Sequence, residues 1–318
     1  MKISLLEPLG VEKIVITKLS QPLIENGHEF IYYDTKTTDP EELKSRSKDS
    51  DIIMIANNPY PKEVIESTKN LKMLSVAFTG IDHIDCDACK RKDITVCNAS
   101  GYSDQSVAEL VIGMSISAMR NIIKSNEIVR KGGTNAEIGG KEICGKTVGI
   151  IGLGRIGLLC AKLFLAFGAK VIAYNRSENP KAKEMGIEYK SLNEVLSKSD
   201  IVSLNLPLNK ETKGFIGKKE IALMRPNTIF INCARGAIVD NTALARALAS
   251  NKLGFACIDV FDNEPPLDSN YPLLSSPNTL LTPHQAFISE ESMMRRAEIV
   301  FNNVYSYING NPINVCNL

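Results

Sequence analysis

One stretch of the sequence decides the fold class: Val148-Gly149-Ile150-Ile151-Gly152-Leu153-Gly154-Arg155-Ile156-Gly157. An apolar strand runs directly into a Gly-x-Gly-x-x-Gly turn that opens a helix, and a second strand then completes a βαβ unit. Gly152 permits the tight turn, Gly154 lets the backbone approach a pyrophosphate, and Gly157 lets the helix pack on the strand. The free N–H groups at the helix N-terminus favour bound phosphate. The stretch therefore predicts a dinucleotide-binding unit, with a plain strand–helix turn as the alternative.

Short β-branched runs alternate with helical patterns along most of the chain, which is typical of α/β folds with parallel sheets. The expected strands before residue 100 are 2–6, 29–33, 51–56, 73–77 and 94–97. Those after it are 147–151, 170–174, 201–204, 228–232, 254–260 and 279–281. One long helix is expected over 103–130 and a last helix over 289–310. We predict two doubly wound parallel-sheet (Rossmann or flavodoxin-like) units.

The composition is that of an ordinary globular protein. The chain has 318 residues, of which 44% are apolar and 23% charged, so about two domains are expected. The 37 basic and 36 acidic residues leave a net charge of +1, which gives no electrostatic footprint for nucleic acid or a membrane surface. No segment approaches the roughly 20 apolar residues of a spanning helix, and the N-terminus is expected to form a strand, not a signal peptide. Eight dispersed cysteines indicate reduced thiols and a cytoplasmic location.

The residues after the second strand of the βαβ unit bear on the choice of dinucleotide. An acidic residue there usually accepts hydrogen bonds from the adenosine ribose of NAD. This chain has Asn175-Arg176-Ser177 instead. Asn175 is neutral, Arg176 can pair with a phosphate, and Ser177 can donate to one. The pattern favours NADP(H), and NAD(H) with Arg176 as a solvated surface charge is the alternative.

Three later strands run into polar residues that suit chemistry on a carbonyl. Arg235, Glu264 and His284 each follow one of these strands. Because ligands in open α/β sheets bind beyond the carboxyl ends of the strands, the three side chains are expected at the same edge as the glycine-rich turn. Carbonyl reduction requires a cation that binds a carboxylate, a proton donor that is active near neutral pH, and an acid that orients this donor. The alternatives are a structural ion pair for Arg235, an acidic turn residue for Glu264 and a capped loop histidine for His284.

The other two histidines are weaker candidates. His28 follows a glycine before a strand and is expected on the surface. His83 lies in Gly80-Ile81-Asp82-His83 and could contact a substrate. Cys86 and Cys89 form a single C-x-x-C, but a zinc site needs four ligands, so helix packing is favoured and no metal is expected.

These motifs together resemble the D-isomer-specific 2-hydroxyacid dehydrogenases over nearly the whole chain. The resemblance rests on the ordered motifs Phe78-Thr79-Gly80-Ile81-Asp82-His83-Ile84-Asp85, Ser106-Val107-Ala108-Glu109, the glycine-rich turn, Leu206-Pro207-Leu208, Asn232-Cys233-Ala234-Arg235-Gly236 with Val239-Asp240, Asp259-Val260-Phe261 with Glu264-Pro265, and Thr282-Pro283-His284. So many motifs in order make the resemblance highly specific.

The resemblance implies a role for each motif. Arg235 would hold the carboxylate and carbonyl of a 2-oxo acid, His284 would protonate the carbonyl oxygen, and Glu264 would hydrogen-bond the imidazole. Asp259 would face the nicotinamide carboxamide. The remaining cofactor positions it implies are Ser106, Arg155, Ile156, Leu206, Pro207, Cys233 and Ala234, and the substrate positions are Phe78, Thr79 and Gly80 with backbone amides at the last two, and Asn58.

The resemblance also implies the order of the domains. A split substrate domain, residues 1–100 plus 286–318, would enclose an inserted dinucleotide-binding domain, residues 101–285. A hinge at the two crossings would close the site and expel water. Family members commonly pair through the dinucleotide-binding domain, so a homodimer is expected.

Some positions depart from the family pattern. Asn175 stands at the usual ribose-binding acid, Phe78 stands where glycine is common, and Gln285-Ala286-Phe287 follows His284 where many members have an aliphatic and small residues. The loop 57–60, which carries arginine in phosphoglycerate-specific members, is uncharged here, and no regulatory domain of the serine-metabolism type is expected after residue 318. An unphosphorylated substrate is therefore expected.

Two rival functions stay open. One is a dinucleotide-sensing, corepressor-like binding protein on the same fold, against which the full set of Arg235, Glu264 and His284 argues. The other is a formate-type dehydrogenase, which has glutamine at the position of Glu264.

Overall fold

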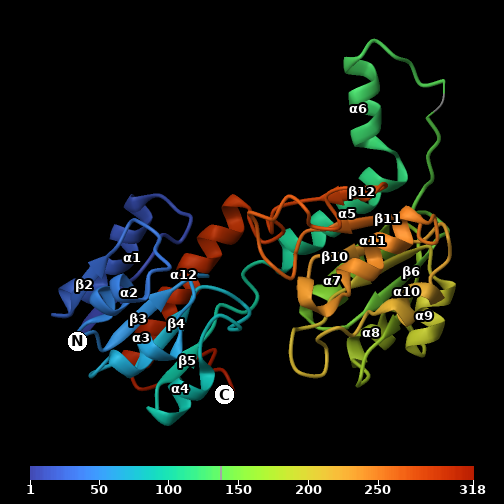
Figure 1. Cartoon of the computed structure of the whole chain (residues 1–318). Helices are drawn as coiled ribbons and strands as arrows, with labels where there is room; N and C mark the ends of the chain where they lie inside the picture. Colours follow the sequence, from blue (N-terminus) through green and yellow to red (C-terminus); the bar gives the residue numbers. More distant parts are fainter. Residues whose placement is uncertain (137) are drawn as a thin grey trace. The chain divides into compact units, whose positions relative to one another are not determined.

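The computed structural model describes residues 1–136 and 138–318 and divides the chain into two compact units. Unit 1 comprises Met1–Ser103 and Ile288–Leu318, and unit 2 comprises Asp104–Phe287. Figure 1 shows the red C-terminal helix beside the blue N-terminal elements, so the two ends of the sequence build unit 1 together.

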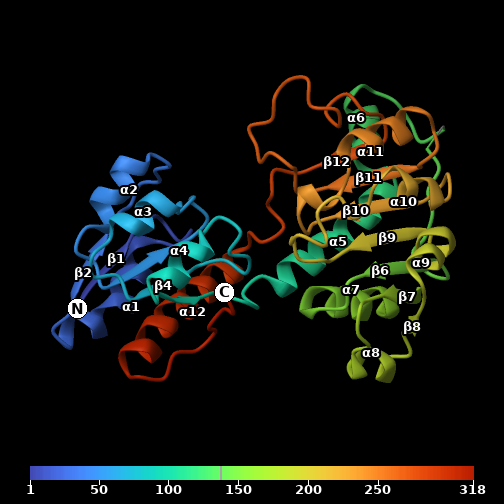
Figure 2. The same ribbon diagram turned by 60° about the horizontal axis from the view of Figure 1, so that its bottom comes forward.

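Unit 1 is built on a five-stranded parallel sheet with the order β2-β1-β3-β4-β5. The strands are β1 (Lys2–Leu5), β2 (Glu29–Tyr32), β3 (Ile52–Ile55), β4 (Met73–Val76) and β5 (Thr95–Cys97). The helices are α1 (Lys13–Glu25), α2 (Pro40–Ser47), α3 (Lys62–Ser67), α4 (Cys86–Arg91) and α12 (Glu290–Ile308). Helices lie on both faces of the sheet (Figure 2), and α12 packs on β4, where Ser75 Oγ donates a hydrogen bond to the carbonyl of Val300 at 3.0 Å.

Unit 2 is built on a seven-stranded parallel sheet with the order β12-β11-β10-β9-β6-β7-β8. Its strands are β6 (Thr147–Ile151), β7 (Lys170–Tyr174), β8 (Glu188–Tyr189), β9 (Ile201–Leu204), β10 (Ile229–Asn232), β11 (Phe255–Ile258) and β12 (Thr279–Leu281). Its helices are α5 (Asp104–Met119), α6 (Ile122–Arg130), α7 (Arg155–Ala166), α8 (Pro180–Glu184), α9 (Leu192–Lys198), α10 (Lys218–Leu223) and α11 (Asn241–Ala249), with a 3₁₀ turn at Gly236–Ile238. Chain order reverses between β6 and β9, the position where doubly wound folds bind ligands. The α/β fold class is confirmed for both sheets.

The strands of unit 2 are apolar on both faces because helices cover both. Ile150 packs into the core shared with α5 and α7, and the next residue, Ile151, packs into the core on the opposite face. Near-continuous apolar runs are typical of such doubly covered parallel strands. Gly149 is needed for this packing, since a Cβ there would lie 2.4 Å from Ser199 Oγ and 2.7 Å from Val195 Cγ1.

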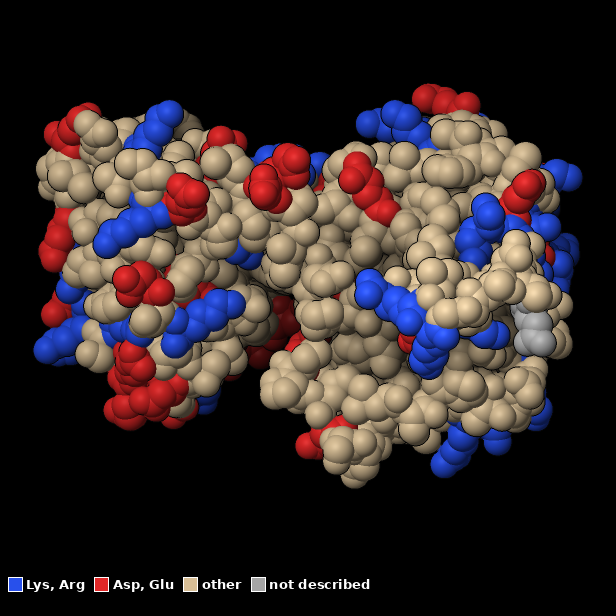
Figure 3. Space-filling model, turned by 90° about the horizontal axis from the view of Figure 1, so that it is seen from above, with Lys and Arg blue, Asp and Glu red and all other residues tan. Residues whose placement is uncertain are grey.

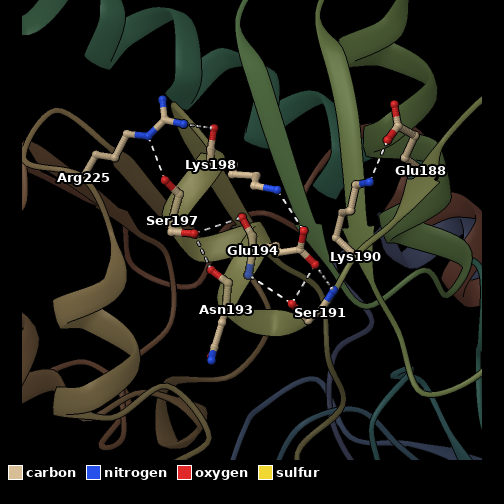
Figure 4. Close-up of polar contacts among 8 residues, drawn as sticks. All are labelled: Glu188, Lys190, Ser191, Asn193, Glu194, Ser197, Lys198 and Arg225. Carbon is tan, nitrogen blue, oxygen red and sulfur yellow. Dashed lines mark hydrogen bonds and ion pairs between the residues drawn. The ribbon is translucent and has the colours of Figure 1, made fainter.

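The sequence Ser191-x-x-Glu194 predicts a capping box at the start of a helix, and the structure has this box at α9 (Figure 4). Ser191 Oγ accepts the N–H of Glu194 at 3.3 Å, and Glu194 Oε2 accepts the N–H of Ser191 at 3.2 Å. The ammonium of Lys198 and the hydroxyl and backbone N–H of Ser191 lower the pKa of Glu194 to about 2. Helix α9, which packs against β6, therefore begins at the residue that its sequence indicates.

The single helix expected over 103–130 is wrong, because the chain breaks it into α5 and α6, which are bent by 56°. Asn121 lies at the break in the left-handed region, with φ of +52°, and its Nδ2 donates to the carbonyl of Gly139 at 2.8 Å. Asparagine tolerates this conformation, and no proline or glycine marks the site.

Several expected strands also run one to two residues too far, because residues such as Leu6 and Tyr33 leave the sheet while keeping one ladder hydrogen bond. The two-residue β8 has no counterpart among the expected strands.

Among the described residues, no one helix is both long and apolar enough to cross a membrane, and α5 with α6 pass that test only as a bent pair, on length and composition.

Figure 3 shows acidic and basic side chains on the same face of each unit, which agrees with a formal net charge of +1.

Candidate active site

Three neighbouring strands of unit 2 deliver the predicted chemical groups to one edge of the sheet. The strands β10, β11 and β12 are adjacent and parallel, and their carboxyl ends lead to Arg235, Glu264 and His284 respectively. His284 Nδ1 lies 3.1 Å from Glu264 Oε1, and the two side chains are 23% and 46% exposed. The structure thus pairs the imidazole with the carboxylate that the sequence selected.

Asp259 organises the backbone that carries His284. Its carboxylate is completely buried. One oxygen accepts the hydroxyl of Thr282 at 2.5 Å and the N–H of Gln285 at 2.9 Å, and the other accepts the N–H of Ala286 at 2.9 Å. His284 takes a positive φ of +53°, and its own N–H donates to the carbonyl of Asp259 at 2.8 Å. This clamp was not expected from the sequence, which assigned Asp259 only to the nicotinamide.

A second clamp holds the loop that carries Glu264. The hydroxyl of Tyr271 donates a hydrogen bond to Asp262 Oδ1, which also accepts a hydrogen bond from Asn241 Nδ2 at 3.2 Å. Burial and the Asp262 carboxylate raise the pKa of Tyr271, so the phenol stays a donor. The ring of Tyr271 also meets Phe261 edge to face, with centroids 5.7 Å apart. Sequence reasoning missed Asp262 and Tyr271, although an acid two residues before Glu264 was visible.

The turn that carries Arg235 is fixed by its neighbours. Asn232 accepts the N–H of Ala234 and donates to the carbonyl of Arg235, both at 3.0 Å. The next residue is Gly236, and glycine is needed there because a Cβ would lie 1.8 Å from the carbonyl carbon of Phe261. The guanidinium Nη1 donates to the carbonyl of Ala234 at 2.8 Å. Two hydrogen bonds to Asn232 and the close approach of Gly236 to Phe261 therefore hold the backbone that presents Arg235.

Two further residues that the sequence analysis singled out lie at this edge. Phe287 meets the ring of His284 edge to face, at 5.4 Å between centroids and 88° between planes, so the departure from the family pattern lies directly against the imidazole. Cys233 contacts Met114, with 3.8 Å between the sulfurs, and burial raises the pKa of its thiol. The Cys233 side chain thus packs against α5.

The glycine-rich turn leaves room for a pyrophosphate. Gly152 has φ of +95°, and a Cβ there would lie 2.7 Å from the carbonyl oxygen of Asn205. A Cβ at Gly157 would lie 1.9 Å from the carbonyl oxygen of Gly152. In contrast, a Cβ at Gly154 would meet nothing within 4 Å, and α7 has no side-chain cap at its N-terminus. Open space in front of uncapped helical N–H groups fits a bound dinucleotide phosphate.

The rest of the predicted dinucleotide positions follow strands of the same sheet or lie at the starts of α5 and α7. Asn175 Oδ1 accepts the N–H of Leu153 at 3.2 Å, and its Nδ2 donates to the carbonyl of Ser177 at 2.7 Å. Arg176 is exposed and pairs with Glu211 at 2.5 Å between Nη1 and Oε2. The other positions are Leu206 and Pro207 after β9, Ala234 after β10, Ser106 in the first turn of α5, and Arg155 and Ile156 at the start of α7, where Arg155 pairs with Asp104 at 2.7 Å.

The predicted substrate positions lie in unit 1, after β3 and β4. Phe78 and Asn58 are buried, at 7% and 6% exposed. The carbonyl of Thr79 accepts Asn98 Nδ2 at 2.9 Å, and Gly80 follows it. Within the described part of the chain, the buried Asn58 Nδ2 and Thr79 Oγ1 have no hydrogen-bond partner. Buried polar atoms without partners are uncommon in native folds and suit a polar ligand.

The weaker candidates of the sequence make local contacts. His28 Nδ1 lies 3.2 Å from the N-terminal amine, and His83 meets the ring of Phe78 edge to face at 6.4 Å. Cys86 and Cys89 lie on α4, where burial raises the pKa of Cys89 to about 12. The described residues contain no group of three or more metal-ligating side chains suited to a metal.

An α/β unit with a glycine-rich turn and an Arg, Glu and His set at one sheet edge defines a dinucleotide-dependent oxidoreductase. Known proteins agree with this class. Residues 112–286 match the D-isomer specific 2-hydroxyacid dehydrogenase, NAD binding domain. The chain is 36% identical to a hydroxypyruvate reductase of Blautia hydrogenotrophica, covering 92% of each chain. It is 38% identical to a D-3-phosphoglycerate dehydrogenase of Methanocaldococcus jannaschii over 87% of this chain, and spans only 54% of that protein.

The solved structures extend this agreement to the whole fold. An acyclic imino acid reductase in complex with NADPH and D-Arg superimposes with a TM-score of 0.89 at 32% identity, covering all of both chains. The chain belongs to the D-isomer-specific 2-hydroxyacid dehydrogenases. It is a nicotinamide-dependent oxidoreductase that acts on the CH–OH group of 2-hydroxy acids and reduces the corresponding 2-oxo acids.

Proposed function

We propose that the protein reduces a small unphosphorylated 2-oxo acid at the sheet edge that carries Arg235, Glu264 and His284. The observation that carries this proposal is the 3.1 Å contact between His284 and Glu264. That contact lies on the unit that also carries the open glycine-rich turn. Similar proteins are named hydroxypyruvate reductase and glyoxylate reductase, and both of these names refer to small, unphosphorylated 2-oxo acids.

Each group has a separate task in this reaction. Arg235 binds the substrate carboxylate and the carbonyl oxygen with its planar fork. His284 gives a proton to that oxygen during reduction and takes it back during oxidation. Glu264 accepts the Nδ1–H of His284, which leaves Nε2 to carry the transferred proton. The nicotinamide, when bound, supplies or accepts the hydride. In unit 1, we assign the backbone amides of Thr79 and Gly80 and the side chain of Asn58 to the substrate.

An unphosphorylated substrate is supported by the loop after β3. Residues 57–60 are Asn-Asn-Pro-Tyr and carry no charge, whereas a phosphorylated acid would need a cation there. One cation does approach this loop, because Lys36 Nζ lies 3.4 Å from Asn57 Oδ1, but a single flexible lysine is a poor substitute for a bidentate arginine.

For the cofactor, we propose NADP(H) over NAD(H). The Asn175 side chain hydrogen-bonds to both the glycine-rich turn and Ser177. Because it is neutral, it would not repel a 2′-phosphate. Arg176 is exposed beside it, and a similar protein was solved with NADPH. Replacing Arg176 by Ala is expected to weaken NADPH far more than NADH in equilibrium titrations. Equal effects on both dinucleotides would favour NAD(H).

We also propose that two copies pair through α6. No residue of α6 is buried, and Ile122, Ile123 and Val129 are 46%, 49% and 68% exposed. Figure 1 shows α6 standing away from the sheet of unit 2. Two adjoining cavities of about 260 and 480 Å³ lie at its base. Light scattering should show Ile123→Asp to be monomeric and the exposed control Ile14→Asp to remain dimeric, whereas a monomeric wild-type protein would contradict the pairing.

A panel assay tests the activity itself. Glyoxylate, hydroxypyruvate, pyruvate and bulkier 2-oxo acids are each offered with NADPH and with NADH. An added arm supplies an amine with the 2-oxo acid, because an imino acid reductase is among the similar structures. Turnover of a 2-oxo acid supports the proposal. Tight dinucleotide binding without turnover on any arm would instead favour a dinucleotide-sensing binding protein.

A further inference from the structure

The loops on either side of the glycine-rich turn are joined by an ion pair. In the sheet of unit 2, β6 lies between β7 and β9, and the glycine-rich turn follows β6. Arg176 lies in the loop after β7 and Glu211 in the loop after β9, and their charged atoms are 2.5 Å apart. The pair therefore connects the two loops that flank the dinucleotide turn.

A hydrogen-bonded turn holds the loop that carries Glu211. Asn209 Oδ1 accepts the N–H groups of Glu211 and Thr212, each at 2.9 Å. Thr212 Oγ1 donates to the carbonyl of Pro207 at 2.6 Å. The rings of Tyr174, the last residue of β7, and Phe215 stack with centroids 6.1 Å apart. The segments that carry Arg176 and Glu211 therefore also contact each other through these two rings.

We propose that Glu211 sets the selectivity between NADP(H) and NAD(H) by competing with the ribose 2′-phosphate for Arg176. This inference rests on the proposed function, in which Arg176 meets the adenosine end of the dinucleotide. A guanidinium fork pairs with either a carboxylate or a phosphate. NADPH must displace Glu211 to reach Arg176, whereas NADH has no 2′-phosphate and leaves the ion pair intact. Glu211 is thus a specificity-determining residue that opposes the phosphorylated dinucleotide.

The expected size of the effect follows from the exposure of the pair. Arg176 and Glu211 are 74% and 71% exposed, and exposed ion pairs contribute little because water and salt screen them. Removing the carboxylate should therefore tighten NADPH by about two- to fivefold. NADH should stay within about twofold of its wild-type affinity, because its binding does not break the pair.

The test is a double-mutant cycle on the full-length protein. Glu211→Gln, Arg176→Ala and the double variant are titrated with NADPH, NADH, 2′,5′-ADP and 5′-AMP, and the dissociation constants are compared. Glu188→Gln is the matched control, because Glu188 is 69% exposed, lies 3.0 Å from Lys190 in another ion pair, and undergoes the same change in charge. We expect Glu211→Gln to tighten NADPH and 2′,5′-ADP only while Arg176 is present, and Glu188→Gln to change neither.

Two results would overturn this inference alone. If Glu211→Gln tightens NADPH equally in the Arg176→Ala background, Glu211 repels the phosphate directly and does not compete for Arg176. If Glu211→Gln weakens NADH and 5′-AMP, Glu211 binds the ribose hydroxyls. A different pattern marks failure of the proposed function: Arg176→Ala weakens both dinucleotides equally, or the wild-type protein binds neither, and the inference then falls with it.

Discussion

At the carboxyl edge of the sheet in unit 2, Glu264 and His284 are partly exposed and paired with each other. At the same edge of the sheet in unit 1, Glu7 is completely buried and Asn58 is 6% exposed. Both sheets are parallel and doubly wound, so their topology provides the same kind of edge. The difference lies in what the loops do with the polar groups they carry.

Glu7 shows how the edge of unit 1 uses its carboxylate. Its Oε1 accepts the N–H groups of Ala56 at 2.8 Å and Asn58 at 3.0 Å, and so joins the loops after β1 and β3. Burial raises the pKa of Glu7, against the opposing effect of these two hydrogen bonds. A carboxyl group whose oxygen accepts backbone N–H groups is a structural group, whereas Glu264 contacts a side chain that can exchange a proton. The comparison predicts that only the edge of unit 2 moves protons.

The largest effect is expected at His284. Changing His284 to Ala removes the proton donor and should lower the rate of 2-oxo acid reduction by about 10²- to 10⁴-fold, as loss of a general acid usually does. Steady-state kinetics at saturating dinucleotide measure it. A rate near that of the wild type would remove His284 from the mechanism and erase the contrast between the two edges.

Arg235→Lys should have the next largest effect. The ammonium keeps the charge but cannot form two parallel hydrogen bonds to a carboxylate. Loss of one charge-assisted hydrogen bond predicts a fall in kcat/KM of roughly 10- to 100-fold. An unchanged kcat/KM would show that Arg235 acts only through its charge or is merely structural.

The smallest effect is expected at Glu7, and it concerns stability. Because folding raises the pKa of Glu7, the fold favours its protonated form. Its stabilising contribution is therefore present below the unfolded pKa of about 4.5 and is lost as the pH rises through the raised, folded pKa. Glu7→Gln carries no titrating proton, so its stability relative to the wild type should increase as the pH rises from about 4 to 7.

Urea unfolding across that pH range measures the difference, with the exposed Glu25→Gln as control. A constant difference between Glu7→Gln and the wild type would show that Glu7 does not titrate as its burial implies. A loss of turnover as large as that of His284→Ala would make the edge of unit 1 part of the proton chemistry and break the comparison.

Sequence patterns predicted the parts of this protein that depend on nearby residues. The βαβ unit around Gly152 and the capping box of Ser191 and Glu194 arise within a few residues of chain, because each needs only local backbone geometry and apolar periodicity. The polar residues Arg235 and His284 were found because strands end in recognisable patterns, and parallel strands bring their ends to one edge.

Tertiary structure alone decided the contacts that join distant residues. The clamp of Asp259 on the His284 loop spans up to 27 residues, and the pair of Arg176 with Glu211 spans 35. At the break between α5 and α6, Asn121 likewise forms a hydrogen bond to Gly139, 18 residues away. No local pattern encodes such contacts, because their free energy appears only once the sheet has brought the strands, and the loops that follow them, side by side.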